Sequence, residues 1–398
     1  MFSEKLSDVL AQAERIGNFP PIPPREFISL LETSAGHRRL AREEIFELLN
    51  GTLSKENRDL ALEFAEGYRR PHDRDILLLP PLYFSNICEN DCTYCDFSAN
   101  GIRLTPEQFL NEFDHLVDMK YRSIELVSAQ DPELYLHVNG FTLEAQQFHL
   151  DRVLAYFQLA KRRLMQSGGG MLTSNIPPVD LDSFRKLRTV GLDCYLIWME
   201  TFNPAQYSLL HYEKGPKSNQ AFRVDSLERA ARAGIEHLAG AFLKGLYDWR
   251  KEELVLYCLD GYLEENLGHG LSIIGTPRLK GPFATSGLVS AFSVSDEDYE
   301  LNIALDRTLF NGILWLQTRE SFERNRRLLN RFGGGVILTL TSSTAPGGYH
   351  SSYPTRAQFP VHKQELAASV GELEDRGFKV HFDWNVQTLS SFQRRVLS

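Results

Sequence analysis

This sequence of 398 residues has few cysteines, no excess of positive charge and few long apolar runs. The first thirty residues contain no apolar run long enough for a signal peptide or a membrane span, so we expect a cytoplasmic protein without a membrane partner. The formal net charge of -9 provides no basic field for a polyanion, which argues against a nucleic-acid partner. Five cysteines, unevenly spaced, are too few for the disulfide framework of a secreted domain.

Short apolar runs alternate with helical patterns along most of the chain. Candidate strands lie at 76–83, 123–128, 171–176, 194–200, 238–243, 271–276, 313–318 and 336–340. Eight strands that alternate with helices predict an α/β fold, a parallel (β/α)8-type barrel that is open or closed. We expect an N-terminal helical extension over 1–75, the barrel over 76–345 and a C-terminal segment that caps the barrel over 346–398.

Two helices are marked by their ends. Thr105 predicts an N-cap, Pro106 suits the first helical position and Gln108 completes a capping box, so a helix should run to about Met119. A second helix should begin at Ser226 and end before Gly234, because glycine favours the backbone conformation that terminates a helix.

Three of the five cysteines, Cys88, Cys92 and Cys95, fall within eight residues. Three thiolates on one loop can hold three corners of a 4Fe-4S cluster. Cys194 opens a predicted strand and Cys258 lies in an apolar helical run, so neither is a convincing fourth ligand. Zinc would need a fourth ligand as well. The spacing therefore predicts a cluster with one open iron, at which a small molecule can bind.

The pattern C-x3-C-x2-C, with Tyr94 before the last cysteine, resembles the signature of the radical S-adenosylmethionine (radical SAM) enzymes. The resemblance covers about residues 60–385 and is strongest to the aromatic amino-acid lyases, in particular to the 2-iminoacetate synthases, the tyrosine lyases of thiamine biosynthesis. The segments that carry it are 83–100, 198–202, 211–215, 232–235, 277–280, 318–320 and 346–349. It implies a radical SAM barrel whose open iron binds S-adenosylmethionine, which is cleaved reductively to a 5′-deoxyadenosyl radical.

Two related branches fit less well. The tyrosine lyases of di-iron hydrogenase maturation carry a second cysteine-bound cluster near their C-terminus, and no cysteine follows Cys258 here. The tryptophan lyases of thiopeptide biosynthesis lack the Pro-Gly-Gly-Tyr segment that stands at 346–349 in this chain.

The resemblance also implies roles for residues near the carboxyl ends of the predicted strands. It implies that the substrate is held by Tyr83, Arg319 and Ser342, with Arg319 on the α-carboxylate and the two hydroxyls on the amino group. It implies that the cofactor is contacted by Tyr94, Gln130, Glu200, Arg223 and Arg278. Ordinary packing, hydrogen bonding and ion pairing are the alternatives for each of these side chains.

The chain departs from this family at several positions. Gln130 stands where relatives have a glutamate, and its amide lacks the charge that strengthens a hydrogen bond to an ammonium. Asp131 is the candidate substitute. Phe202, Lys280 and Ser343 also differ from the common residues, and these three changes bear on the substrate more than on the radical chemistry.

We therefore expect an enzyme, a radical SAM lyase that cleaves the Cα–Cβ bond of tyrosine or a similar amino acid to 2-iminoacetate (dehydroglycine) and p-cresol. One alternative is a diverged radical SAM enzyme that acts on another carboxylate-bearing small molecule. A second alternative is a non-catalytic iron-sulfur protein. The expected partners are an electron donor of the flavodoxin or ferredoxin type and, as a further candidate, a thiazole synthase-like protein.

Overall fold

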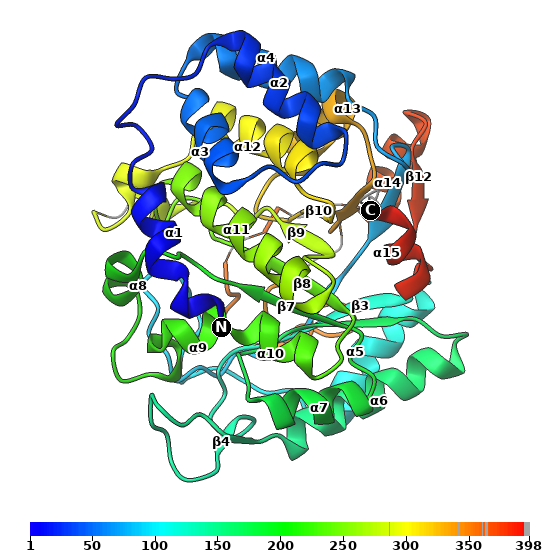
Figure 1. Cartoon of the computed structure of the whole chain (residues 1–398). Helices are drawn as coiled ribbons and strands as arrows, with labels where there is room; N and C mark the ends of the chain where they lie inside the picture. The colour runs from blue at the N-terminus through cyan, green and yellow to red at the C-terminus, as the bar shows by residue number, and fades with distance from the viewer. Residues whose placement is uncertain (286, 341–342, 360, 363–364, 394–398) are drawn as a thin grey trace.

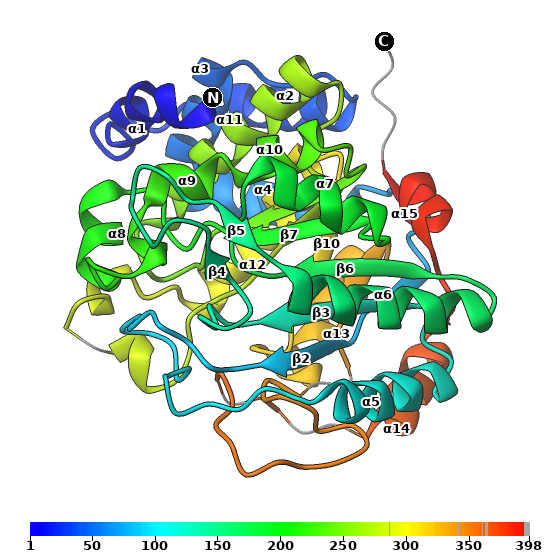
Figure 2. The ribbon, with the colours of Figure 1, turned by 90° about the horizontal axis from the view of Figure 1, so that it is seen from below.

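A ten-stranded parallel sheet forms the centre of the protein in this computed structural model, which describes residues 1–285, 287–340, 343–359, 361–362 and 365–393. The hydrogen-bonded order is β12-β1-β11-β10-β9-β8-β7-β6-β3-β2. The strands are β1 (Asp75–Leu78), β2 (Pro81–Ser85), β3 (Ser123–Ser128), β6 (Met171–Asn175), β7 (Cys194–Trp198), β8 (His237–Ala241), β9 (Ile273–Gly275), β10 (Ile313–Leu316), β11 (Val336–Leu338) and β12 (Lys379–His381). Figure 2 shows β2, β3 and β6 side by side.

The first predicted strand, 76–83, is in fact two strands with different neighbours. β1 pairs with β11 and β12, whereas β2 pairs with β3 at the other end of the order. Pro80 and Pro81 interrupt the run because proline has no N–H to donate to a strand ladder.

Only two residues separate β1 from β2, so the two ends of the sheet must lie close together. The sheet therefore curls into a partial barrel. Within the described ranges β2 makes no ladder with β11, so the barrel is open along that seam. The other seven predicted strands are confirmed with small differences at their ends, whereas β12 was not predicted.

Helices cover the outside of the barrel and precede it. Those before the sheet are α1 (Leu6–Ala13), α2 (Pro24–Ala35), α3 (Arg42–Gly51) and α4 (Lys55–Gly67). Those that follow successive strands are α5 (Pro106–Asp118), α6 (Asp151–Gln166), α7 (Leu181–Thr189), α8 (Pro204–Leu210), α9 (Gln220–Val224), α10 (Ser226–Arg232), α11 (Trp249–Leu267), α12 (Asp296–Leu309) and α13 (Phe322–Phe332). The last two helices are α14 (Leu366–Asp375) and α15 (Val386–Phe392). None of the described helices is both long and apolar enough to cross a membrane.

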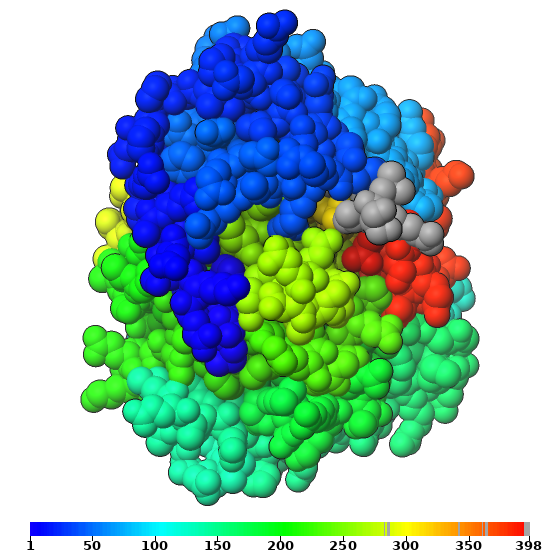
Figure 3. Space-filling view, in the orientation of Figure 1, coloured from blue at the N-terminus to red at the C-terminus, as the bar shows by residue number. Residues whose placement is uncertain are grey.

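The N-terminal helices pack on the outside of α11 and α12, as Figure 1 shows. In Figure 3 the chain's first helices, in blue, lie across the yellow-green surface that includes α11. A short antiparallel hairpin, β4 (Leu136–His137) with β5 (Phe148–His149), lies between β3 and α6 and was not predicted.

The predicted helix ends are confirmed. Thr105 Oγ1 accepts a hydrogen bond from Gln108 N at 3.2 Å, and Gln108 Oε1 accepts from Thr105 N at 2.8 Å, which is a complete capping box at the start of α5. After α10, Gly234 has a φ of +85° and terminates the helix.

Apolar side chains fill the half of the barrel that lies toward the amino ends of the strands. This plug consists of Leu77, Leu79, Met171, Cys194, Leu196, Ala239, Ile273, Ile313, Trp315 and Ile337, together with Trp384, Leu389 and Phe392 from the C-terminal segment. The plug closes the barrel at the amino ends of the strands, so a cavity can form only toward their carboxyl ends. The domain boundaries proposed from the sequence stay a prediction.

Candidate active site

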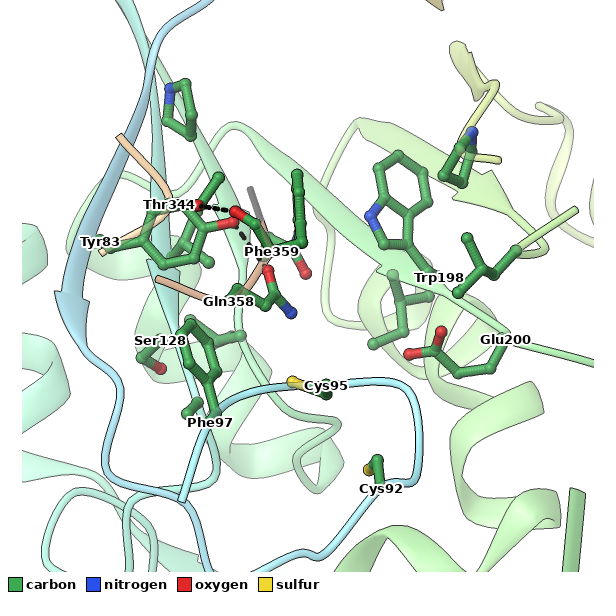
Figure 4. Close-up of a pocket in the computed structure, with 18 of the residues that line it drawn as sticks. Tyr83, Cys92, Cys95, Phe97, Ser128, Trp198, Glu200, Thr344, Gln358 and Phe359 are labelled. Carbon is green, nitrogen blue, oxygen red and sulfur yellow. Dashed lines mark hydrogen bonds between the residues drawn. The ribbon is translucent and has the colours of Figure 1, made fainter. Parts of the chain in front are cut away.

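A cavity opens at the carboxyl ends of the strands, above the apolar plug. It measures about 1170 Å³, including the open space at its mouth. Residues from five strands and from the loops that follow them form its walls, and Figure 4 shows part of this lining. In parallel barrels this end carries the chemistry, because the loops after successive strands converge there.

All three clustered cysteines line this cavity, on the loop that follows β2. The loop is held by backbone hydrogen bonds: Cys88 N donates to Ser98 O at 3.0 Å, and Cys95 N donates to Cys92 O at 3.2 Å. Figure 4 shows Cys92 and Cys95 on this loop, between Glu200 on one side and Phe97 on the other.

The cysteine loop fits a cluster better than a single ion. Across the described ranges no three His, Cys, Asp or Glu side chains lie close enough together to hold one metal ion. A 4Fe-4S cluster does not require that, because each cysteine binds a different iron. Burial raises the pKa of the Cys95 thiol to about 12, so this thiol stays protonated until a metal displaces its proton. The donor set and the cavity therefore fit the predicted cluster.

Tyr94, between two of the cysteines, is anchored to the chain around α8. The ring nitrogen Nδ1 of His211 lies 2.7 Å from Tyr207 O and must donate to it, because a carbonyl only accepts. Nε2 of His211 is then the acceptor for the Tyr94 hydroxyl at 2.6 Å. Burial lowers the pKa of His211 to about 3, so the imidazole is neutral. Tyr94 is thereby fixed beside the cysteines, as its predicted role requires.

Glu200 lies two residues after β7 in a left-handed conformation, with φ at +66°, and lines the cavity. Its carboxylate accepts from Lys217 Nζ at 2.7 Å and from Arg223 Nη2 at 3.2 Å. Burial alone would raise the pKa of Glu200, but these two cations outweigh burial and lower it to about 2. The ion-pair alternative for Glu200 and Arg223 is therefore realised, and their contact with the cofactor stays a prediction.

Lys217 also connects Glu200 to the cysteine loop. Its ammonium donates to Tyr94 Oη at 3.1 Å, and its backbone N donates to Asn90 Oδ1 at 3.0 Å. A Cβ at Gly215 would lie 2.6 Å from that Asn90 oxygen, so glycine is needed there for the close approach. These contacts make the cysteine loop and the Glu200 side of the cavity one connected structure.

The predicted substrate residues Tyr83 and Arg319 lie in the same cavity. The Tyr83 hydroxyl donates to Gln358 Oε1 at 2.8 Å, a bond drawn in Figure 4. The Arg319 guanidinium carbon lies 3.6 Å from the centre of the Phe359 ring. In the described part of the chain no carboxylate lies within ion-pair distance of Arg319, which stays charged although burial lowers its pKa. Ser342, the third predicted substrate residue, lies outside the described residues.

Gln130 lines the cavity and is buried, and its amide Nε2 makes no hydrogen bond to the described residues. Its neighbour Asp131 is not among the lining residues. The Asp131 carboxylate is held by Arg103, with 2.6 Å between Oδ1 and Nη2 and 2.8 Å between Oδ2 and Nε. Asp131 therefore does not face the cavity in place of Gln130.

Arg278 is the one predicted cofactor residue in the described ranges that does not line the cavity. Its guanidinium donates to both oxygens of Glu320, at 2.8 and 2.7 Å, and to Asp296 at 2.8 Å. These bonds use the N–H donors that a cofactor carboxylate would need, so the geometry favours the ion-pair alternative.

Several lining residues were not singled out from the sequence. They are Glu125, Asn175, Trp198, Trp315, Thr344, Gln358 and Phe359. Glu125 gave a usable signal, a carboxylate in the middle of the apolar run 123–128. No local pattern in the sequence marked Gln358 and Phe359, because a loop far along the chain brings these two residues back over the barrel.

Comparison with known proteins supports the predicted family. Residues 82–257 match the family model described as "Radical SAM superfamily". The 2-iminoacetate synthase of Escherichia coli (strain K12) is 26% identical over 363 residues, which cover 89% of this chain and 90% of that protein. The crystal structure of the FeFe-hydrogenase maturase HydG from Carboxydothermus hydrogenoformans has a TM-score of 0.75 and 26% identity, covering 96% of this chain and 83% of that chain. A further HydG structure, with a TM-score of 0.79, 23% identity and coverage of 95% and 80%, has the same fold, which confirms the partial parallel barrel with N-terminal helices.

Proposed function

We propose that this chain, whose residues 82–257 match the model of the radical SAM superfamily, is a radical SAM lyase that cleaves the Cα–Cβ bond of tyrosine or a similar free amino acid. The products would be 2-iminoacetate and p-cresol. The observation that carries this proposal is that the cavity lined by the three cysteines is also lined by Arg319, a cation without a carboxylate partner in the described residues. The similarity to a 2-iminoacetate synthase supports the same reaction.

Cys88, Cys92 and Cys95 would hold the 4Fe-4S cluster, and Tyr94, Gln130 and Glu200 line the space beside them where S-adenosylmethionine would bind. When bound there, the cluster and S-adenosylmethionine would supply a 5′-deoxyadenosyl radical, the species that takes a hydrogen atom from the substrate. The electron that starts this reaction would come from a flavodoxin or ferredoxin-type protein, and a thiazole synthase-like protein is our proposed consumer of the labile imine.

Arg319 would bind the substrate α-carboxylate. A guanidinium offers two parallel N–H donors to a carboxylate, and the Phe359 ring beneath it fixes the plane of that fork. Tyr83, whose hydroxyl is oriented by Gln358, would face the amino group. The walls of the cavity exclude water and other C–H bonds, which a reactive radical would otherwise attack.

The proposal is tested by anaerobic reconstitution of the protein with iron and sulfide, followed by incubation with reductant, S-adenosylmethionine and tyrosine. We expect 5′-deoxyadenosine and p-cresol to form together, and neither to form in a Cys95→Ala variant. Deoxyadenosine without p-cresol would contradict the lyase reaction. An electron paramagnetic resonance spectrum of the reduced cluster that S-adenosylmethionine leaves unchanged would point to a non-catalytic iron-sulfur protein.

A diverged enzyme that acts on another carboxylate-bearing molecule is the second candidate. It is favoured by Phe202, Lys280 and Ser343, which differ from the common residues of the tyrosine lyases and bear on the substrate more than on the radical chemistry. Incubation with a panel of other amino acids separates the two candidates, since only the true substrate should accelerate deoxyadenosine formation.

A further inference from the structure

The deep end of the cavity has a largely aromatic floor and a polar corner beside it. Trp198 and Trp315 form the aromatic part, with ring centres 5.8 Å apart and ring planes at 54°. A Cβ at Gly275 would lie 2.3 Å from the Trp198 ring, so the glycine at the end of β9 makes room for it. The polar corner consists of Glu125 on β3 and Asn175 on β6.

Glu125 is a buried carboxyl group with few polar partners in the described part of the chain. Its residue is 3% exposed, and Oε1 accepts one hydrogen bond, from Asn175 Nδ2 at 3.1 Å. In the described ranges no Lys, Arg or His lies within ion-pair distance, and burial raises the pKa of Glu125 to about 8. A buried carboxyl with a single hydrogen-bond partner among the described residues is costly to a fold, so packing alone does not account for it.

The strand register places this corner below the substrate residues. Glu125 pairs with Pro81 of β2, whereas Val127, two residues further along β3, pairs with Tyr83. Two residues along a strand correspond to about 6.6 Å, so Glu125 lies one inward-facing layer deeper than Tyr83. Burial raises the pKa of Tyr83, an ionised Glu125 would raise it further and Arg319 lowers it, so the tyrosine lies within the electrostatic range of both side chains. An amino acid whose carboxylate meets Arg319 can thus direct its side chain toward Glu125.

We propose that Glu125, oriented by Asn175, is a specificity-determining residue that hydrogen-bonds a hydroxyl group at the far end of an aromatic amino-acid side chain. The aromatic floor suits a ring, and the polar corner suits a substituent on it. This inference rests on the proposed function, since it takes Arg319 as the site of the α-carboxylate. Glu125 would then make the site bind hydroxylated aromatic amino acids more tightly than phenylalanine.

The test is equilibrium dialysis of labelled tyrosine and labelled phenylalanine against the reconstituted holoenzyme with S-adenosylmethionine but without reductant, so that binding is measured apart from turnover. We expect the wild-type protein to bind tyrosine about 10- to 100-fold more tightly than phenylalanine, because phenylalanine leaves the buried polar corner without a partner. Glu125→Leu should remove that preference, and the isosteric Glu125→Gln should reduce it at least about threefold. Glu144→Gln, which changes a carboxylate on an exposed loop, should keep the wild-type ratio.

The inference would be overturned if the ratio of the affinities for tyrosine and phenylalanine were the same in the wild-type and Glu125→Leu proteins. It would also be overturned by a wild-type preference for 4-aminophenylalanine or tryptophan over tyrosine, which would assign the corner to an amine or an indole N–H. Thermal unfolding of each variant and the effect of S-adenosylmethionine on the reduced cluster's spectrum verify that the variants fold. If tyrosine is bound with the expected preference but is not cleaved, the lyase proposal fails while the inference about Glu125 holds.

Discussion

Two buried carboxyl groups in one cavity, Glu125 and Glu200, have pKa values displaced in opposite directions. Both are desolvated, but only Glu200 has cations beside it, Lys217 and Arg223. The pKa of Glu200 is therefore lowered to about 2, whereas burial raises that of Glu125 to about 8. At neutral pH one side of the cavity carries a fixed charge, and the deep corner holds a neutral acid.

The raised pKa of Glu125 predicts a pH-dependent effect on stability. The folded state binds this proton more tightly than the unfolded chain, whose carboxyl titrates near its ordinary 4.5, so the wild type loses stability as the pH rises from about 4.5 to 8. Glu125→Gln lacks this loss. The melting temperature of the variant should match the wild type near pH 5 and exceed it by about a few degrees at pH 8.5. A difference that is constant across this range, measured by calorimetry, would contradict the assigned burial.

Arg319 predicts a separation between substrate binding and cofactor binding. Arg319→Lys keeps a positive charge but loses the two-pronged contact, so the KM for the amino acid should rise about 10- to 100-fold. The spectral change that S-adenosylmethionine causes in the reduced cluster should be preserved. The measurements are steady-state kinetics and paramagnetic resonance, with Arg162→Lys on the outer helix α6 as the control. Loss of the spectral change with an unaltered KM would place Arg319 at the cofactor instead.

At the scale of elements, helix α5 holds the loop that closes over the cavity. The buried carboxylate of Glu112 accepts from the backbone N atoms of Tyr349, His350 and Ser351 at 2.8, 2.7 and 2.8 Å. The Tyr349 hydroxyl donates to Pro81 O at 2.6 Å. Since residues 343–359 carry Thr344, Gln358 and Phe359 into the cavity, Glu112 positions part of the site without touching it.

Glu112→Gln should therefore loosen this loop. An amide offers one acceptor oxygen and turns an N–H group toward the backbone donors, so at least one of the three bonds is lost, at a cost of about 1–3 kcal/mol. Hydrogen exchange of residues 346–353 should become faster, and the KM for the amino acid should rise more than kcat falls. Glu107→Gln, on the exposed first turn of α5, is the control. Unchanged exchange in the Glu112 variant would show that the loop is held by other contacts.

The elements could be predicted from the sequence where local patterns dominate. Seven strands were predicted because each is a short apolar run buried on both faces, and the start of α5 because its cap lies within four residues. The division of the first strand was missed because the apolar run continues through Pro80–Pro81, although these prolines cannot extend the ladder. β12 is only three residues long and half-buried, so it has no comparable pattern.

At the scale of the whole molecule, the N-terminal helices cover the outside of the barrel, and the C-terminal segment fills its amino end. Phe2, Leu6 and Leu10 are buried where the N-terminal segment packs along α11, and Glu14 on this segment pairs with Lys251 at 2.6 Å. At the other end, Trp384 donates from Nε1 to Leu78 O at 2.6 Å inside the barrel.

Contacts between such distant segments also limited what the sequence could predict about the site. The cysteines were identified from spacing within one loop. The ion pairs of Arg278 depend on Glu320 and Asp296, and the hydrogen bond of Tyr83 depends on Gln358. These partners lie elsewhere along the chain and meet Arg278 and Tyr83 only in the folded protein. Family resemblance supplied candidates for these positions, but it could not supply the pairings.

The N-terminal packing predicts a loss of stability on truncation. Removal of residues 1–16 exposes the face of α11 that these side chains cover, and each buried leucine or phenylalanine contributes about 1.5–3 kcal/mol. The truncated protein should melt at a lower temperature and bind more of a hydrophobic dye than the full chain. An unchanged melting temperature would show that this segment does not contribute to the folded barrel's stability.

The central claim is that the cysteine loop and Arg319 bring a radical and an amino acid together in one cavity. The most direct measurement is a mass-spectrometric balance after anaerobic turnover with S-adenosylmethionine and tyrosine that carries a ¹³C-labelled ring. The claim predicts ring-labelled p-cresol in amounts equal to 5′-deoxyadenosine, with both products strongly reduced in Arg319→Lys at limiting tyrosine. Recovery of all the label as intact tyrosine, while deoxyadenosine accumulates, would contradict it.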